Sequence, residues 1–416
     1  MHHDYPAVVL DLSANGLGIV RSLRRIGIQV YAYDIKDKYR IGKTRYATCG
    51  ICPHPVYEEK EMLFFLTQLG RSLAKKAVLY AGSDDFVYFI SKNREELAPY
   101  YFFLLPEHSL VEAVLDKICT YQLACERNVP SPKTFVVHHV DKLESIISEL
   151  DFPCILKPAY PLEFRKRLNK KAMIIEDAVQ LRQEYPFYRQ FGELVIQEII
   201  PGNDENMYEV CTFFDEQMNL IGLFTGQKLH QFPPFFGAGA LVLSIRDEEV
   251  AEAGISFLKA LQFKGLAHAE FKRDPRDGTL KFIEINARTT FWNSLSEPCG
   301  VDLSYLYYLS LTGQQPEPRT EQKEGMKWVY FVRDYLSFRQ KRKNGVMTFA
   351  EWVKSLSGKK EYALFAWDDP LPFFRSLFSH LYNDWKNSRK NNDKKGVFSK
   401  WLLSKEHSKQ KNGLIK

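Results

Sequence analysis

Two strand-like segments separated by a tight turn dominate the second half of this sequence. Residues 267–272 and 280–285 alternate between apolar and polar side chains, as expected for strands that bury one face. The segment Asp274-Pro-Arg-Asp-Gly278 between them has the composition of a turn. This pattern predicts an antiparallel β-hairpin.

The predicted hairpin collects oxygen-bearing side chains on one face. Glu284 and Asn286 are two residues apart and therefore point to the same side of their strand, while the turn brings Glu270 opposite them. Carboxylate and amide oxygens suit Mg²⁺, which also keeps room for phosphates. We therefore predict a metal site formed by Glu270, Glu284 and Asn286. Arg288, one step further along the same face, could hold an anion there.

Length and composition limit the class of protein. The chain has 416 residues, enough for two or three domains, and 45% of them are apolar. No run approaches the roughly 18 uninterrupted apolar residues of a membrane-spanning helix. The first residues lack the charged and apolar regions of a signal peptide. The cysteines are scattered and odd in number, seven in all, which favours a reducing cytoplasm over a disulfide framework.

The formal net charge of +6 is unevenly distributed. Residues 386–416 contain ten Lys or Arg against Asp393 and Glu406, so residues 1–385 carry about −2. A nearly neutral body argues against nucleic acid as a partner.

The end of the chain allows two interpretations. Apolar side chains recur at helical spacing before the basic tail and again within it; they are Phe373, Phe374, Leu377, Phe378, Leu381, Trp385, Phe398, Trp401, Leu402 and Leu403. One interpretation is an interfacial helix that holds a cytoplasmic protein at the inner face of the membrane. The other, which we favour, is a helix packed on the body followed by a flexible tail.

The first hundred residues alternate between strand and helix patterns. Strands are predicted at residues 7–12, 30–34 and 77–81, with helices between and after them, so a parallel sheet is expected. Ligands of such sheets gather at the carboxyl ends of strands. Ser83 and Asp84 follow the third strand and are candidates for substrate binding.

The rest of the chain divides into three parts. Residues 134–197 read as strand, helix, strand, loop, strand, helix and strand, and residues 195–312 are richer in strands. The proline-containing segment 314–319 marks a boundary. Beyond it we predict one strand at 328–335 and mostly helix thereafter. A long helix is also predicted at 110–128.

Two strand ends carry candidate ligand contacts. Lys157 ends an apolar strand, where a lysine either meets an anion such as phosphate or reaches water along an edge. Gln197 and Glu198 interrupt another apolar strand before a Pro-Gly turn. A carboxylate there could accept from an adenine amino group, or the segment could be an ordinary edge strand.

Three further motifs have weaker interpretations. The loop from Lys228 to Gly239 could bring backbone amides to an oxyanion, or it could be a packed aromatic loop in which His230 is structural. Gly16-Leu-Gly18 lacks the third glycine of a dinucleotide fingerprint, and a tight turn explains it. Cys49-Gly-Ile-Cys52 has no second Cys pair, so a zinc site is not favoured.

Taken together, and in this order, these motifs resemble the ATP-grasp superfamily. The resemblance runs from about residue 6 to residue 313. Within the superfamily the chain most resembles the carboxylate–amine ligases, including the D-aspartate ligase-like group and predicted enzymes of cell-surface polymer clusters. The supporting stretches are Gly226-Gln-Lys-Leu-His-Gln-Phe-Pro-Pro234, Gly237-Ala-Gly-Ala240, Glu284-Ile-Asn-Ala-Arg288 and Trp367-Asp-Asp-Pro370.

The resemblance implies an α/β fold with five parts. An N-terminal Rossmann-like pre-ATP-grasp domain (1–110) is followed by a two-lobed α+β ATP-grasp fold. Its small lobe, with linker helix and lid, covers 111–196, and its central lobe with the metal site covers 197–315. A mostly helical C-terminal extension (316–385) and a basic tail (386–416) complete the chain. Such ligases are often homodimers.

The resemblance also implies roles for individual residues. Lys117 and Lys157 would neutralise ATP phosphates, and Gln197, Glu198 and the backbone of Ile200 would hold adenine. Glu205 would bind the ribose. One or two Mg²⁺ ions, or Mn²⁺, would lie at Glu270, Glu284 and Asn286. Arg288 and Lys228 would be the catalytic residues, and Ser83, Asp84 and Gly239 would bind the substrate.

The expected reaction joins a carboxylate to an amine with ATP. The carboxylate attacks the γ-phosphorus, and an amine then attacks the resulting acylphosphate. One departure from the family pattern leaves an alternative open. The lid segment 158–171 contains no glycine, so Lys166, Arg167, Lys170 or Lys171 would have to replace backbone amides. The alternative is a degenerate ATP-grasp protein that binds nucleotide without ligating anything.

Overall fold

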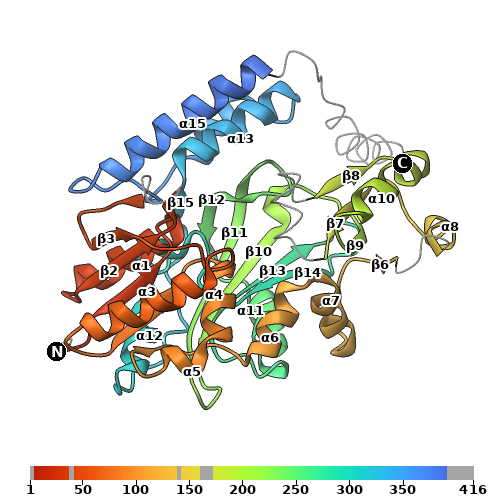
Figure 1. Ribbon diagram of the computed structural model, residues 1–416. Coiled ribbons are helices and arrows are strands. Elements are labelled where there is room, and N and C mark those ends of the chain that lie inside the picture. Colours follow the sequence, from red (N-terminus) through yellow and green to blue (C-terminus); the bar gives the residue numbers. More distant parts are fainter. Residues whose placement is uncertain (1–3, 37–41, 138–141, 160–171, 391–416) are drawn as a thin grey trace.

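The computed structural model describes residues 4–36, 42–137, 142–159 and 172–390, which form three β-sheets and the helices around them (Figure 1). The predicted lid residues 166, 167, 170 and 171, and the tail after residue 390, lie outside the described residues. Among the residues that are described, we find no helix with the length and apolar character needed to cross a membrane.

The N-terminal sheet has five parallel strands in the order β3-β2-β1-β4-β5. Its strands are β1 (Ala7–Leu10), β2 (Val30–Asp34), β3 (Thr48–Ile51), β4 (Ala77–Ala81) and β5 (Tyr101–Phe102). Its helices are α1 (Ala14–Arg25), α3 (Glu59–Ser72), α4 (Asp84–Lys92) and α5 (Arg94–Leu97). The predicted parallel sheet is confirmed, and β1 is buried along its whole length because helices cover both faces.

The predicted helix at 110–128 is two helices, α6 (His108–Leu115) and α7 (Lys117–Glu126). They meet at Asp116, whose carboxylate accepts hydrogen bonds from the backbone amides of Ile118 and Cys119. Apolar periodicity continues through this point, but an N-cap begins a new helix axis there. The break places Lys117 on the first turn of α7.

The small sheet is antiparallel, with the order β6-β9-β7-β8. Its strands are β6 (Thr134–Val136), β7 (Cys154–Pro158), β8 (Met173–Ile175) and β9 (Leu194–Glu198), and its helices are α8 (Leu143–Ile147) and α10 (Ala178–Arg189). The predicted order of strands and helices in this lobe is confirmed, while the predicted loop between β7 and β8 falls on residues 160–171, outside the described ones. Because β7 and β9 are neighbours in the middle of the sheet, Lys157 and Gln197 come close together.

The central sheet has seven strands in the order β14-β13-β10-β11-β12-β15-β16. They are β10 (Met207–Phe214), β11 (Leu220–Phe232), β12 (Ala238–Ser244), β13 (Gly265–Arg273), β14 (Leu280–Asn286), β15 (Lys327–Val329) and β16 (Lys360–Tyr362). The accompanying helices are η2 (Asp204–Asn206), α11 (Glu248–Ala260), η3 (Asn293–Leu295) and α12 (Leu303–Leu311). The predicted hairpin is β13–β14, and Gly278 in its turn has a φ of +79°.

The predicted strand at 328–335 is wrong beyond its first residues. β15 ends at Val329, and α13 (Phe331–Lys343) begins directly after Tyr330. Buried Asp334, Ser337 and Phe338 show the spacing of one helix face, which a short window of alternating aromatics conceals. The described part of the chain ends with α14 (Phe349–Ser355) and α15 (Leu371–Lys390), so the mostly helical extension is confirmed.

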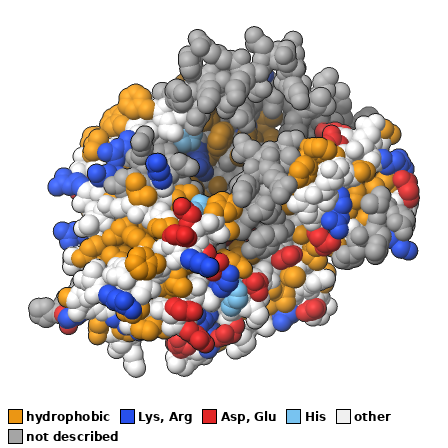
Figure 2. All heavy atoms as spheres, in the orientation of Figure 1, with side chains coloured by type: hydrophobic (Ala, Val, Ile, Leu, Met, Phe, Trp, Pro, Cys, Tyr) orange, Lys and Arg blue, Asp and Glu red, His pale blue; other side chains and the backbone are white. Residues whose placement is uncertain are grey.

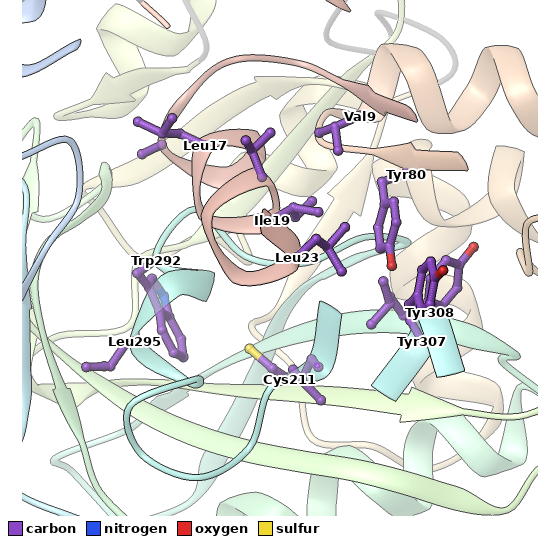
Figure 3. Packing of buried hydrophobic residues seen from close by; sticks show 14 of the residues in the cluster. Val9, Leu17, Ile19, Leu23, Tyr80, Cys211, Trp292, Leu295, Tyr307 and Tyr308 are labelled. Atoms are coloured by element: carbon purple, nitrogen blue, oxygen red, sulfur yellow. The ribbon is translucent and has the colours of Figure 1, made fainter. Parts of the chain in front are cut away.

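The N-terminal sheet and the central sheet share one hydrophobic core (Figure 3). Leu17 and Leu23 of α1 belong to this core together with Trp292, which directly precedes η3, and Tyr307 of α12. Gly18 allows this approach, because a Cβ there would lie 2.8 Å from Asn293 Nδ2. The glycines after β1 therefore serve helix packing.

Candidate active site

The β13–β14 hairpin pairs the residues predicted to bind metal. Glu270 lies opposite Glu284, and His268 lies opposite Asn286. On the other side of β13, Glu270 is also opposite Glu209 of β10. Side chains at paired positions share one face of a sheet, so these five residues form a polar band across three strands.

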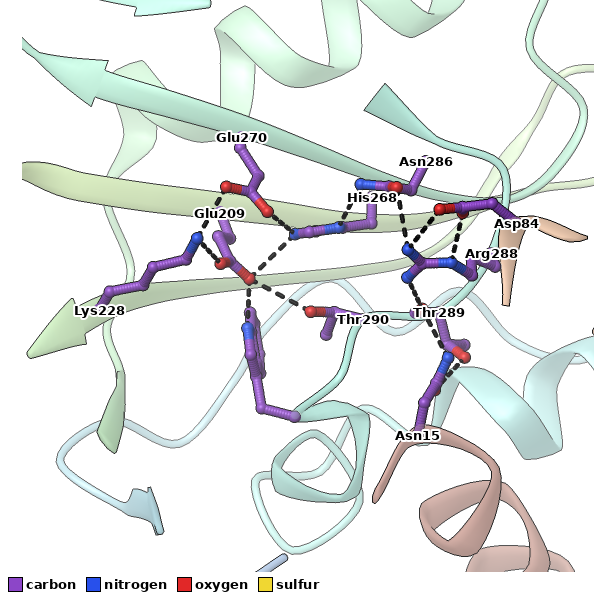
Figure 4. A network of polar contacts seen from close by, with 11 residues as sticks. Asn15, Asp84, Glu209, Lys228, His268, Glu270, Asn286, Arg288, Thr289 and Thr290 are labelled. Carbon is purple, nitrogen blue, oxygen red and sulfur yellow. Dashed lines mark hydrogen bonds and ion pairs between the residues drawn. The ribbon is translucent and has the colours of Figure 1, made fainter. Parts of the chain in front are cut away.

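Lys228 of β11 is clamped between two carboxylates of this band (Figure 4). Its Nζ lies 2.8 Å from Glu209 Oε1 and 2.7 Å from Glu270 Oε2, and the lysine is 2% exposed. Burial alone would lower the pKa of Lys228, but the two carboxylates outweigh it and raise that pKa. Lys228 is thus a permanent cation.

Glu209 is the most heavily used acceptor of the site. Besides Lys228 it accepts from the Trp292 indole, from His268 Nε2 at 2.9 Å and from Thr290 Oγ1 at 3.2 Å. Burial alone would raise the pKa of Glu209, but Lys228 and His268 hold it well below the usual range. The carboxylate is therefore ionised throughout the physiological range and fixed from four directions.

The ligand atoms of Glu209, His268 and Glu270 lie within 4.8 Å of one another, a spacing that could hold a metal ion. Of the predicted metal ligands, only Glu270 belongs to this group. Glu284 is buried. Burial would raise its pKa, but Lys117, Arg288 and Lys157 hold it below the ordinary value. Asn286 donates from Nδ2 to His268 Nδ1 at 3.2 Å and accepts from Arg288 at 3.0 Å.

Arg288 connects this band to the N-terminal sheet. Its guanidinium donates to both carboxylate oxygens of Asp84, at 2.6 and 3.2 Å, and Asp84 begins α4 at the carboxyl end of β4. Asp84 was predicted to bind the substrate and Arg288 to be catalytic. In the structure the carboxylate of Asp84 orients Arg288, so these two predicted residues form one unit.

Asn15 of α1 also links the N-terminal sheet to the segment that follows β14. Its Nδ2 donates to the carbonyls of Gly82 and Thr289, both at 2.9 Å, and its Oδ1 accepts from Thr289 Oγ1 at 2.6 Å (Figure 4). Ser83, next to Gly82, has a buried Oγ with no hydrogen-bond partner among the described residues. The carboxyl ends of β1 and β4 thus border the site, as predicted.

The phosphate-binding lysines predicted from the sequence lie near one another. Lys157 donates to Gln197 Oε1 at 2.8 Å, and Tyr121 of α7 donates to the same oxygen at 3.2 Å. Burial and then the charge of Lys117 together lower the pKa of Lys157 to about 7, although Glu284 and Glu270 oppose this shift. A lysine with this pKa gains a proton readily when an anion arrives.

The remaining residues predicted to contact the nucleotide differ in whether protein groups already bind them. The carboxylate of Glu198 accepts from the Lys133 amide at 3.1 Å and pairs with Arg276 at 2.5 Å, so it ties strand β6 to the hairpin turn. The carbonyl of Ile200 accepts from Lys272 at 2.8 Å. Glu205 is exposed on η2. The side chain of Glu198 is therefore already occupied.

Gly239 and His230 border the band on β12 and β11. A Cβ at Gly239 would lie 2.6 Å from the Val242 side chain and within 4 Å of Trp292 and Lys228, so a larger residue would collide with its neighbours here. His230 is buried and its Nδ1 contacts Asp334 of α13 at 2.5 Å. His230 therefore attaches the C-terminal extension to β11.

Sequence reasoning missed Glu209, His268 and Asn15. A weak signal was present, because Glu209 is the only carboxylate in the apolar strand β10 and His268 lies two residues before Glu270. Their importance depends on which strands pair, which their own segments do not specify. Asn15 directly precedes the Gly16-Leu-Gly18 segment that was interpreted as a tight turn, yet its side chain links the two sheets.

Comparison with known proteins agrees with this arrangement, although no protein-family model matches the chain. D-aspartate ligase from Enterococcus faecium is 28% identical over 310 residues, covering 69% of this chain and 72% of that protein. N5-carboxyaminoimidazole synthetase from Staphylococcus aureus, complexed with ADP, superposes with a TM-score of 0.60 at 15% identity, covering 77% of this chain and 81% of that one. L-amino acid ligase from Bacillus licheniformis gives 0.53 at 17%, covering 74% and 71%.

The parallel N-terminal sheet, the small antiparallel lobe and the central sheet with its acidic hairpin give the chain the same fold as these solved structures. In sequence the chain is similar to the D-aspartate ligase. The resemblance inferred from the sequence is confirmed.

Proposed function

We propose that this enzyme activates the carboxylate of an amino acid or similar small acid with ATP and transfers the acyl group to an amine. The observation that carries the proposal is the convergence of Lys117, Lys157, Glu270 and Glu284 from four elements around one face of the central sheet. Two lysines suit a triphosphate, and two carboxylates suit the cation that accompanies it.

The donor set fits Mg²⁺, with Mn²⁺ as a substitute. Glu270 and Glu284 carry carboxylates at paired strand positions, and Asn286 adds an amide oxygen on the same face. Glu209 and His268 are close enough to Glu270 to support it. One or two such ions would neutralise phosphate charge during transfer. Lys117 and Lys157 would hold the phosphates, and Gln197 would orient Lys157.

Nucleotide recognition would rest mainly on the backbone. Because the Glu198 carboxylate is used by Arg276 and Lys133, we assign adenine recognition to the peptide groups between Glu198 and Ile200. The exposed carboxylate of Glu205 would meet the ribose. This division needs no charged side chain against the adenine ring.

Chemistry would occur between the hairpin and Arg288. A substrate carboxylate attacks the γ-phosphorus to form an acylphosphate and ADP, and an amine then attacks the acyl carbon with loss of phosphate. Arg288, held by Asp84, would place the carboxylate. Lys228 would stabilise the oxyanion of the tetrahedral intermediate, a contribution on the order of 10²–10³ in rate. Ser83 and Gly239 would border the substrate.

A Glu284→Gln variant tests this function. The substitution keeps size and hydrogen bonding but removes one metal-binding charge, so Mg²⁺-dependent ADP formation with candidate amino acids should be nearly abolished. Glu252→Gln is the matched control, because Glu252 is exposed on α11 and lies outside the proposed site. Turnover by the variant that equals the wild type would refute the metal assignment. Nucleotide binding without ADP formation for any substrate would favour the degenerate alternative.

Peripheral membrane contact is a separate proposal. Helix α15 packs on the body through Phe373 and Leu377, yet Leu371, Phe374 and Phe378 on its other side are 55%, 44% and 66% exposed. An apolar stripe beside a basic tail suits an anionic bilayer surface. Basic and acidic side chains are interspersed on the face seen in Figure 2. Sedimentation with anionic vesicles, comparing the full chain with Phe378→Ser, tests this contact.

Formation of a homodimer is a further proposal, which light scattering tests.

A further inference from the structure

We propose that Lys272 of β13 is a positioning residue that determines which nucleotide base the enzyme accepts. Lys272 holds the segment between the small lobe and the central sheet, so that the peptide groups of this segment meet the adenine ring in one fixed orientation. The proposal rests on the proposed function and adds a specificity-determining residue to it.

Residues 199–203, the base-reading linker, connect β9 of the small lobe to η2 and β10 of the central sheet. The peptide groups assigned to adenine lie at its start. For residues 199–202, the hydrogen bonds to distant parts of the described chain are those accepted by the carbonyls of Ile200 and Gly202. Both come from one donor, Nζ of Lys272, at 2.8 and 3.2 Å. A single side chain therefore anchors the linker.

Lys272 is a buried cation that is committed to these carbonyls. The residue is 9% exposed, and no carboxylate of the described residues forms an ion pair with it. Lys228 and Lys341, which are also buried, each pair with a carboxylate. Burying an ammonium group costs free energy unless hydrogen bonds compensate it, and bonds from a charged donor are stronger than neutral ones. The two carbonyls supply this compensation for Lys272.

The position of Lys272 relates the linker to the metal site. Glu270 and Lys272 are two residues apart on β13, and the pairing with β10 is regular here, with Glu209 opposite Glu270 and Met207 opposite Lys272. Their side chains therefore share one face of the sheet, with about 7 Å between the two positions. The same strand thus carries a proposed ligand of the phosphate-bound metal and the anchor of the base-reading linker.

Peptide groups that are fixed in one orientation discriminate between purines. Adenine presents a donor at N6 and an acceptor at N1, whereas guanine presents an acceptor at O6 and a donor at N1. A site built to hydrogen-bond the first pattern leaves its own groups unpaired against the second. Without the ammonium group of Lys272, adenine would also have to order the linker on binding, and that loss of conformational entropy would weaken its affinity.

The test compares three ligands on the full chain with Mg²⁺: a non-hydrolysable ATP analogue, the matching GTP analogue, and inorganic tripolyphosphate, which has no base. Calorimetry measures each affinity for the wild type, Lys272→Met and Lys272→Arg. Lys259→Met, at an exposed position of α11 outside the site, is the matched control. If Lys272→Met does not fold, as judged by its thermal transition, Lys272→Gln, whose amide can donate to one carbonyl, carries the test.

We expect the wild type to prefer the ATP analogue, and Lys272→Met to bind that analogue about 10- to 100-fold more weakly. The loss should be smaller for the GTP analogue and absent for tripolyphosphate. Lys272→Arg should recover most of the affinity, because a guanidinium can also donate to two carbonyls, and Lys259→Met should match the wild type. In steady-state assays Lys272→Met should raise KM for ATP and leave kcat unchanged.

The role of Lys272 is overturned if Lys272→Met binds the ATP analogue as the wild type does, if tripolyphosphate is weakened equally, or if the wild type does not distinguish the two bases. Wild-type binding of the ATP analogue in these experiments leaves the proposed function standing. Failure of the wild type to bind any adenine nucleotide would overturn the proposed function together with this role.

Discussion

Lys157 should take up a proton when ATP binds. It is a partly buried lysine with a pKa of about 7, lowered first by burial and then by Lys117. Among the described residues its side chain donates to the neutral oxygen of Gln197, 2.8 Å away. A triphosphate beside it would favour the charged form and raise the pKa again.

The size of the effect follows from the pKa. At pH 8 only about 10% of Lys157 would be protonated before binding, and nearly all of it afterwards, so uptake approaches one proton per nucleotide. At pH 6 uptake would be about 0.1 proton, because the lysine is already charged. The dissociation constant should rise about tenfold between pH 6 and pH 8 as the competent form becomes scarce.

Calorimetry in two buffers of different ionisation enthalpy measures this uptake directly, with a non-hydrolysable ATP analogue and Mg²⁺. Lys157→Arg is the control, since an arginine stays protonated and its variant should bind without proton uptake at pH 8. Tight wild-type binding at pH 8 with no uptake would show that Lys157 is charged in the free enzyme or does not meet phosphate. Either result would refute the reasoning.

Three further outcomes are expected. Lys228→Met should lower the free energy of unfolding by about 3–5 kcal/mol in denaturant titrations, because Glu209 loses its buried counter-ion, and adding Glu209→Gln should restore part of that loss. Burial raises the pKa of Glu361 to about 7, so its ionisation destabilises the fold as pH rises from about 4.5 through 7. Glu361→Gln should therefore raise the free energy of unfolding by about 1–3 kcal/mol at pH 8 and leave it unchanged at pH 4. An equal gain at both pH values would contradict this. Asp84→Asn should reduce kcat/KM for the carboxylate substrate by about tenfold, because it loosens Arg288, while ATP binding stays unchanged.

The local part of the site could be predicted from the sequence because strand periodicity determines it. A two-residue spacing put Glu284 and Asn286 on one face, and turn chemistry at 274–278 fixed the strand that faces them. Lys157 and Gln197 were each recognised as polar residues that end or interrupt apolar strands. Their mutual contact follows once β7 and β9 pair.

The remaining part depends on contacts between distant segments. Glu209 and Lys228 are 19 residues apart, and Asp84 and Arg288 are separated by 204 residues. The sequence around each of these residues does not predict that their charges pair. The same limit explains the false strand at 328–335, where the start of α13 is decided by packing against β11 and β12 and not by local alternation.

The pairing of charges has a consequence for how the site works. Lys228 and Arg288 are already neutralised by fixed carboxylates, so a substrate gains less from them than from a cation whose charge is unmet. Their value lies in position, because ion pairs on neighbouring strands and across two sheets hold them in one geometry before any ligand arrives. The free energy of anion binding must then come mainly from Lys117 of α7 and Lys157 of β7, which lie outside the central sheet. An enzyme built in this way separates the groups that place the reacting atoms from the groups that attract the ligands. Changes to the first set should therefore lower kcat, and changes to the second should raise KM.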